Sequence, residues 1–349
     1  MVSFKYKVWG GGSVVTLREV ADKAGVSLST ASRVVNGYKN VNEETRKKVL
    51  DAIQNLNYVI YEAKRQAKSG IIATVIPKCI GNNMNTYNIT YRVLCGITQR
   101  CNDEKIRNML ILIDENDFDF STVYSENISA FIFVSSSNFE ENTIIPLLCQ
   151  GNVPVITVNR KPDFENISYV DVDDKAACYE AVKYLINSGH KKIGFVHGET
   201  ETQNTNEKFE GYKLALKEAN IPLDNSFVFS AEQKSAETGF LAANYFTKNK
   251  ILPTAVIACS DMIARDLITG FEKCGLSVPD DISVMGFGDM EGTAYLSPSL
   301  TTVRIFSEEM GIEAADIAIK LINDKKRTSI CSCMGYEIIK RESVKELNS

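Results

Sequence analysis

Apolar residues near the start of the chain recur at helical spacing in three short segments. The first opens with Thr16-Leu-Arg-Glu19, which has the form of a capping box, and Gly25 supplies the backbone freedom that ends a helix. The second follows Ser27, a good helix N-cap, and the third opens at Asn42. One small shared core is predicted from the three apolar stripes, which are Leu17, Val20, Ala21 and Ala24, then Ala31, Val34 and Val35, then Thr45, Val49, Ala52, Ile53 and Leu56.

From Ile71 onward short apolar runs alternate with amphipathic helical stretches. This alternation is typical of βαβ units and a parallel sheet. The predicted strands are 71–76, 110–113, 130–134, 153–158, 192–197, 255–259 and 282–286, and the predicted helices are 87–102, 174–188, 207–220, 235–248, 261–274 and 305–323. Because these strands are too many for one mononucleotide fold, we predict an α/β body of two doubly wound lobes with a cleft between them.

Two helices joined by a short glycine-containing turn are typical of a helix-turn-helix, whose second helix enters the major groove of DNA. Leu28, Ser29 and Arg33 lie on the polar face of that helix, so we predict that they contact base edges. Neighbouring polar side chains suit phosphate contacts, and Ser27 at the start of the helix completes the predicted set of Thr16, Ser27, Thr30, Ser32 and Asn36.

The charge is unevenly distributed along the chain. Residues 1–70 contain 8 Lys and 4 Arg against 6 Asp or Glu, a charge of +6, which leaves −11 on the remainder of a chain whose net charge is −5. A basic head on an acidic body indicates that the head alone meets a polyanion.

Little in the sequence points to catalysis or to a resident metal. The chain has no GxSxG, P-loop or HExxH motif and contains only 2 His. Its 9 Cys lack a CxxC pair, although Cys331 and Cys333 form a CxC. We therefore expect no enzyme, no metal site and no cofactor, and mostly buried free thiols.

No run of residues approaches the ~18 to 20 apolar positions that a membrane helix requires. Residues 1–13 carry Lys5 and Lys7, but glycines at 10–12 stand where a secretory signal has its apolar core. We expect a cytoplasmic protein without a membrane partner.

The run Thr16-Leu-Arg-Glu-Val-Ala-Asp-Lys-Ala-Gly-Val-Ser-Leu-Ser-Thr-Ala-Ser-Arg-Val-Val-Asn-Gly37, followed by Val41-Asn-Glu-Glu-Thr-Arg46, closely resembles the headpiece of the lactose-repressor (LacI/GalR) family. The resemblance implies a helix-turn-helix domain for double-stranded operator DNA at 14–59 and a hinge at 60–70. It also implies a two-lobed effector-binding and dimerisation domain at 71–349. Residues 1–13 are an N-terminal extension of uncertain status.

The hinge departs from the family pattern, in which a leucine enters the minor groove. The usual Pro-Asn is Ile60-Tyr61 here, the usual Ala is Lys64, and the leucine position is Ala67. The resemblance implies phosphate contacts from Lys64 and Arg65, and because alanine is too small to wedge a base step, we predict weak kinking at Ala67.

The resemblance covers about residues 14 to 340 and extends to the periplasmic sugar-binding proteins. Clear stretches are Val153-Pro-Val-Ile-Thr-Val-Asn-Arg160 and Val278-Pro-Asp-Asp-Ile-Ser-Val-Met-Gly-Phe287. It implies a periplasmic-binding-protein-like core whose strand ends place an effector on Arg160, Asp173, Asp261 and Asp289, with a pocket loop from Asn82 to Tyr91. An Asp just after a strand is also a common helix cap, so both roles stay open for Asp173 and Asp261.

Three pocket positions differ from sugar-binding members of the family. Asn206 replaces an arginine, Lys234 replaces a stacking aromatic, and Gly288 replaces the first Asp of the usual pair. Lys234 together with Arg160 favours a charged or phosphorylated effector.

The predicted function is a sequence-specific DNA-binding transcriptional regulator of the repressor type. We expect a homodimer on a near-palindromic operator, controlled by a small-molecule effector that is a sugar or a sugar derivative. The alternative is a solute-binding protein without operator function, because its body would look alike.

Overall fold

The computed structural model describes residues 17–35, 41–56, 70–77, 84–113, 127–134, 144–146, 148–149, 153–164, 166–198, 202–231, 237–324 and 328–347. The chain divides into two compact units, which we call the head (Met1–Ser69) and the body (Gly70–Ser349).

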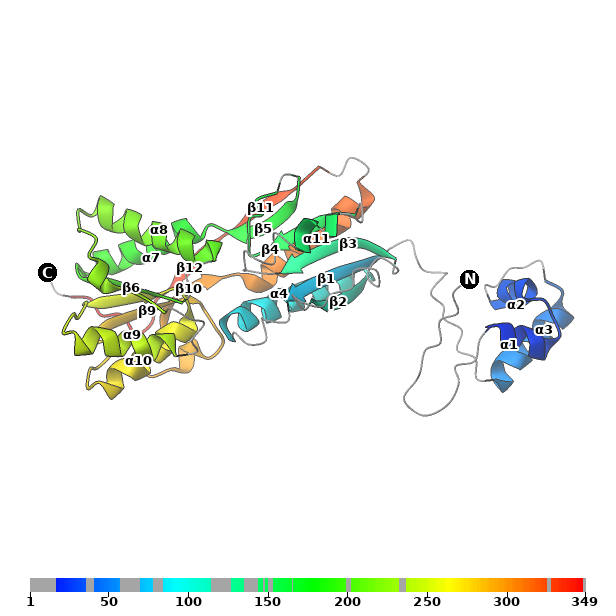
Figure 1. The fold of residues 1–349 in the computed structure, drawn as a ribbon, viewed down its shortest axis with the longest axis horizontal. Helices are drawn as coiled ribbons and strands as arrows, with labels where there is room; N and C mark the ends of the chain where they lie inside the picture. Colours follow the sequence, from blue (N-terminus) through cyan, green and yellow to red (C-terminus); the bar gives the residue numbers. More distant parts are fainter. Residues whose placement is uncertain are drawn as a thin grey trace. The chain divides into compact units, whose positions relative to one another are not determined.

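The described part of the head consists of the helices α1 (Leu17–Ala24), α2 (Leu28–Val35) and α3 (Glu43–Asn55) (Figure 1). At the start of α3 the Asn42 side-chain oxygen accepts a 2.7 Å hydrogen bond from the Glu44 amide, which satisfies one of the free donors of a helix N-terminus. The apolar stripes meet in one core, as their spacing predicts. Its buried members are Val20, Ala21, Ala31, Val34, Val49, Ala52 and Ile53.

The first lobe of the body contains a parallel sheet in the order β11-β5-β4-β3-β1-β2. Its strands are β1 (Ile71–Pro77), β2 (Arg107–Ile113), β3 (Ile128–Val134), β4 (Val155–Val158), β5 (Ser168–Val172) and β11 (Cys331–Met334). The second lobe has the order β12-β10-β9-β8-β6-β7, parallel except for the antiparallel pair of β10 and β12. Its strands are β6 (Ile193–His197), β7 (Val228–Ser230), β8 (Ala255–Ala258), β9 (Ser283–Gly288), β10 (Thr301–Ile305) and β12 (Tyr336–Ile339).

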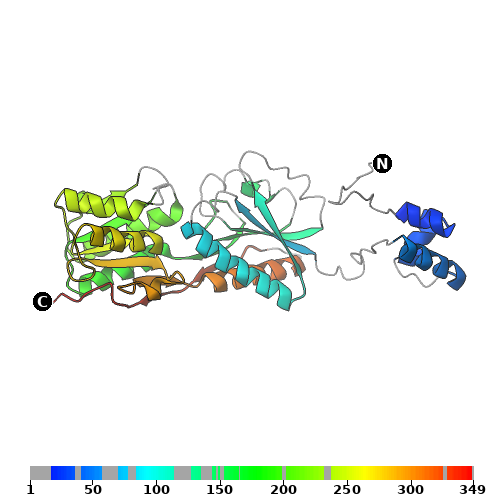
Figure 2. The same ribbon diagram turned by 90° about the horizontal axis from the view of Figure 1, so that it is seen from below.

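Helices cover both sheets. Helix α4 (Met84–Asp103) packs along α11 (Ser307–Asn323) on the first lobe, as Figure 2 shows. Glycines make this close packing feasible, because a Cβ on Gly96 would meet the Glu308 backbone and one on Gly311 would meet the Val93 backbone. The second lobe carries two packed pairs, α7 (Asp174–Asn187) with α8 (Gln203–Glu218) and α9 (Thr238–Lys248) with α10 (Asp261–Lys273).

Three short connections join the two lobes within the described residues. Asp173 lies between β5 and α7, Phe306 lies between β10 and α11, and Gly335 lies between β11 and β12. Both lobes are therefore built from discontinuous stretches of chain, and any movement between them must pass through these connections.

The two-lobed α/β architecture and each of the predicted strands and helices are confirmed, with shifts of a few residues at their ends. The pattern missed β5, β7, β10, β11 and β12. Strands β7, β11 and β12 lie at sheet edges and need no continuous apolar run, whereas β5 and β10 carry polar residues such as Asp171 and Thr302.

The predicted pocket loop from Asn82 to Tyr91 is wrong for residues 84–91. These residues are the start of α4. The predicted loop overlapped the helix predicted at 87–102, and the buried side chains of Thr90, Val93, Ile97 and Cys101 at helical spacing favour the helix.

Candidate functional site

The turn between α1 and α2 is fixed by its own hydrogen bonds. Gly25 has a positive φ of 66°, and the Val26 amide donates to the Ala21 carbonyl at 3.0 Å, which closes the end of α1. The Ser27 hydroxyl oxygen accepts from the Thr30 amide at 3.1 Å and so caps α2. The sequence Gly-Val-Ser thus sets the angle at which α2 leaves α1.

Helix α2 buries one face and presents another. Ala31 and Val34 are in the core, whereas Ser29 and Arg33 are exposed and Leu28 keeps 45% of its surface accessible. Thr30 and Ser32 are half-buried beside this face, which brings together the predicted DNA-contacting side chains of α2. The other predicted DNA-binding residues lie outside the described residues, namely Thr16, Asn36, Lys64, Arg65 and Ala67.

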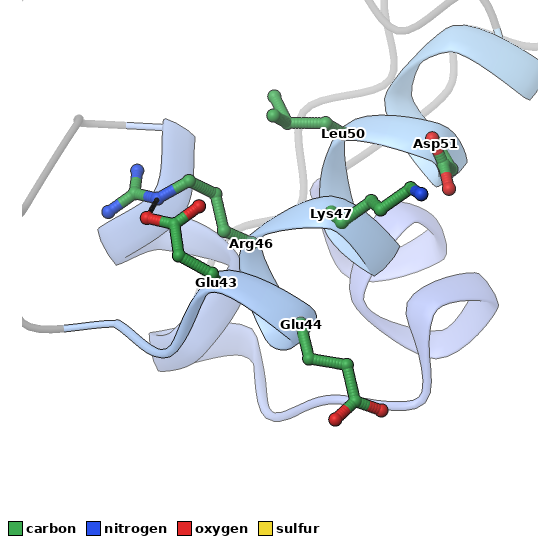
Figure 3. A pocket seen from close by; sticks show the side chains of 6 residues that line it. All are labelled: Glu43, Glu44, Arg46, Lys47, Leu50 and Asp51. Atoms are coloured by element: carbon green, nitrogen blue, oxygen red, sulfur yellow. Dashed lines mark ion pairs between the residues drawn. The ribbon is translucent and has the colours of Figure 1, made fainter.

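A shallow hollow on α3 is of a different kind (Figure 3). Its lining is rich in carboxylates, with Glu43 3.5 Å from Arg46 and Glu44 2.8 Å from Lys48 at helical spacing. Because these carboxylates are paired with basic side chains one helical turn away, the hollow is a charge-balanced surface of α3.

In the body, the predicted effector residues fall into different environments. Arg160, just after β4, is only 4% exposed. Asp173 accepts a 2.8 Å hydrogen bond from the Ala176 amide and caps α7. Asn206 is exposed on α8, and Tyr91 is exposed on the outer side of α4 beside Leu94 and Thr98. Asn82 and Lys234 lie outside the described residues.

Asp261 is buried at the start of α10 and already has two donors. It accepts from the Thr302 hydroxyl at 2.5 Å and from the Met290 amide at 2.6 Å. Burial raises the pKa of Asp261 to about 6, although these two hydrogen bonds lower it. Asp261 therefore ties the segment after β9 to β10.

Asp289 is held by two arginines. Arg304 and Arg341 each donate to it at 2.7 Å. Burial alone would raise the pKa of Asp289, but the two guanidinium groups outweigh this effect and lower it. In the described structure, Asp261 and Asp289 thus act first as internal braces of the second lobe.

A buried polar cluster that the sequence pattern missed links the lobes. Asn204, near the start of α8, donates to the Asp174 carboxylate at 2.7 Å and to the Asn159 carbonyl at 3.3 Å. Asn159 follows β4 of the first lobe and α8 belongs to the second, so this amide makes a direct contact between the lobes. Lys208 completes the cluster, with its Nζ 3.5 Å from Asp174 and 4.2 Å from the centre of the Phe287 ring.

Burial governs the electrostatics of this cluster. Burial would lower the pKa of Lys208, but the nearby Asp174 carboxylate outweighs this and raises it. Burial raises the pKa of Asp174 as well, although Lys208 and Asn204 lower it. Burial also raises the pKa of Asp171 to about 7, with further contributions from Asp174 and Glu207. The sequence contains one indication that Lys208 lies on the buried face of α8. It precedes the buried Tyr212 by four residues, and residues four apart share one face of a helix.

The described residues contain no helix long and apolar enough to cross a membrane. Nor do they contain a group of three or more His, Cys, Asp or Glu side chains that could hold a metal ion.

Comparison with known proteins identifies the two units. Residues 16–59 match the model of bacterial regulatory proteins of the lacI family, and residues 182–344 match a periplasmic binding protein-like domain. The HTH-type transcriptional repressor PurR of Vibrio vulnificus (strain CMCP6) is 30% identical over 338 residues, which cover 96% of this chain and all of the relative. The chain belongs to the lacI family.

Solved structures of lacI-family regulators share the fold. The lac repressor dimer bound to operator and the anti-inducer ONPF superimposes with a TM-score of 0.72 at 22% identity, covering 95% of this chain and 99% of that one. The regulator CelR in complex with cellobiose gives a TM-score of 0.69 at 23% identity, with 94% and 99% covered. Since the lacI family consists of DNA-binding transcriptional regulators, the expectation of a regulator and not an enzyme is confirmed.

Proposed function

We propose that this lacI-family regulator is a homodimeric repressor. Helix α2 of each copy reads one half of a near-palindromic operator, and a small molecule bound between the lobes changes operator affinity. The observation that carries the proposal is α2 itself, a capped helix whose exposed face gathers Leu28, Ser29 and Arg33 on a head that forms its own compact unit. Because operator DNA lies in the bacterial cytoplasm, we place the protein there.

The side chains of α2 have distinct proposed roles. Arg33 has the planar donors to take a guanine bidentately, and Leu28 has the apolar surface to pack on a thymine methyl. Ser27, Ser29, Thr30 and Ser32 offer hydroxyl groups at the start of the helix, where phosphates are also favoured by the helix dipole. Thr16, Asn36, Lys64 and Arg65 are proposed to add phosphate contacts, and the small Ala67 to limit kinking.

The polar cluster between the lobes is the proposed effector site. Asn204 uses both of its donors there, and its buried side-chain oxygen has no hydrogen-bond partner among the described residues, so it can accept from a ligand hydroxyl. Asp174 lies 3.5 Å from Lys208, which leaves little net charge for an anion. We therefore favour a neutral sugar or sugar derivative; a phosphorylated effector would depend on Lys234.

Dimerisation is proposed to use the outer surface of the first lobe. Leu110 and Leu112 on the edge strand β2 and Tyr91 on α4 each keep more than half of their surface exposed, which is unusual for large apolar side chains. Replacing both Leu110 and Leu112 with Glu should convert dimers to monomers in sedimentation experiments. A dimer that survives both replacements would place the interface elsewhere.

The operator is tested by selecting sequences from random duplex DNA with the purified chain at fixed salt. We expect an enriched inverted repeat that the matched variant Arg33→Ala no longer enriches, while Lys23→Ala on α1 still does. Binding that is only salt-sensitive and equal for all three proteins would contradict operator recognition and support a solute-binding role.

The effector is tested by thermal shift with neutral sugars and sugar phosphates. A neutral sugar should stabilise the body of the wild type and of Lys213→Met, but not of Asn204→Ala. Stabilisation by sugar phosphates alone would overturn the neutral effector and support the phosphorylated one.

A further inference from the structure

Two cysteines stand side by side on the outermost strand of the first lobe. The expectation of mostly buried thiols is wrong for the described cysteines, of which only Cys101 and Cys178 are buried. Cys331 and Cys333 are both exposed on β11, which among the described strands pairs with β5 alone at the edge of the sheet. Residues two apart in a strand point to the same face, so the two thiols share one side of the sheet. On the opposite side, Ile330 and Met334 pack against the main core of the body.

The register shows what surrounds the thiols. Cys331 is paired with Tyr169 and Cys333 with Asp171, and paired residues of neighbouring strands lie on the same face. Burial and then the neighbouring Cys331 raise the pKa of the Tyr169 phenol, in keeping with the pairing of the two residues across the strands. The edge thus holds two sulfurs, with one phenol beside them.

Strand geometry separates the possible uses of these thiols. Positions two apart in a strand are about 6.6 Å apart, whereas a disulfide needs its Cβ atoms roughly 3.5 to 4.5 Å apart. A disulfide would therefore require β11 to bend out of the sheet. A metal–sulfur bond of about 2.3 Å lets one ion span two sulfurs up to about 4.6 Å apart, which side chains leaning towards each other can reach.

The donor set also restricts the ion. Zinc in proteins is normally held by four ligands, and the described residues offer no group of three or more His, Cys, Asp or Glu at any one place. Soft thiolates alone select soft ions such as Cu(I), for which two sulfurs are sufficient.

We propose that Cys331 and Cys333 form a two-thiolate site for a soft metal ion of low coordination number, with Cu(I) as its representative. Binding forms two metal–sulfur bonds and releases both thiol protons, without any change in oxidation state. The site lies on β11, which leads through Gly335 to β12 in the second lobe. It is independent of the DNA-binding and effector sites proposed above.

The test is a titration of the full chain with Cu(I) under anaerobic conditions, in competition with a chelator that absorbs light when it holds Cu(I). The variants are Cys331→Ser, Cys333→Ser and the double replacement. Cys149→Ser is the matched control, because Cys149 is another exposed thiol of the same lobe. Circular dichroism establishes that each variant is folded.

We expect each single replacement to weaken Cu(I) binding at least about tenfold, the double replacement to remove the site, and Cys149→Ser to bind as the wild type does. X-ray absorption on the copper-loaded wild type should show two sulfur neighbours. Equal copper retention by the wild type and the double variant would overturn the proposal, as would a Cys331–Cys333 disulfide formed by mild oxidation without loss of secondary structure.

Discussion

The exposed face of α2 and the polar cluster between the lobes differ in how their polar side chains are stabilised. On α2 the proposed DNA-contacting side chains Ser29 and Arg33 are exposed, so water hydrates them in the protein alone. In the cluster, Asp174 and Lys208 are buried and must be compensated within the protein itself.

This difference predicts how the two regions respond to change. Replacing an exposed residue of α2 should affect DNA binding and leave folding intact. Replacing one member of the buried cluster should affect folding as well, because its partner loses compensation. The experiments below test that contrast, beginning with the largest expected effect.

Lys208→Met should destabilise the body by about 3 to 5 kcal/mol, because it leaves the Asp174 carboxylate buried without its cation. Urea unfolding measures this change. The matched control is Lys213→Met on the same helix, where Lys213 forms a surface pair with Glu210 at 2.5 Å and the expected loss is about 0.5 kcal/mol or less. Equal losses for the two variants would remove the contrast between cluster and surface.

Asp171→Asn should change how the stability of the body depends on pH. Burial first, and then the Asp174 and Glu207 carboxylates, raise the pKa of Asp171 to about 7. The folded wild type resists ionising this group, so it loses stability as pH rises from about 4 to about 7, by up to about 4 kcal/mol.

The Asn variant has no carboxyl group to ionise at this position, so its stability relative to the wild type should rise over the same pH range. Unfolding midpoints at pH 5 and pH 8 measure the effect, with the exposed Asp103→Asn as control. A constant difference between Asp171→Asn and the wild type at both pH values would show that Asp171 does not titrate there.

Arg33→Ala should weaken operator binding by about 1 to 3 kcal/mol, or about 5- to 150-fold, without changing effector affinity or the stability of the body. Fluorescence anisotropy on the selected operator and on a scrambled duplex measures this. A base contact reduces binding to the operator only. If binding to both duplexes falls equally, Arg33 contacts phosphate instead.

Ser27→Ala should destabilise the head by about 1 kcal/mol, because the Thr30 amide loses its capping acceptor. Thermal unfolding of the head measures this small change. Ser29→Ala is the control, since its exposed hydroxyl contacts the Ser27 hydroxyl at 3.1 Å but, among the described residues, is not the acceptor of the capping Thr30 amide. A midpoint unchanged in Ser27→Ala but lowered in Ser29→Ala would reverse the assignment.

The local sequence pattern was sufficient to predict burial and exposure where these depend only on a residue's position along its own helix. The alternation of Ala31 and Val34 with Ser29 and Arg33 defines both the buried and the exposed face of α2, and Ser27 caps its start. The same reasoning found the helices and the apolar strands of the body. It failed for edge strands such as β11, where half of the residues face solvent and no apolar run marks the strand.

The sequence by itself thus determined the helix-turn-helix head, the two-lobed body and the family to which the chain belongs, because these follow from short-range periodicity and from a long run of residues that resembles the family headpiece. Only the tertiary structure decided which polar residues meet. Asp261 and Asp289 accept hydrogen bonds from Thr302 and Arg341, which lie 41 and 52 residues further along the chain, and Asn204 of the second lobe donates to Asn159 of the first. Contacts between distant parts of the chain depend on how sheets and lobes are assembled, and no local pattern encodes that assembly.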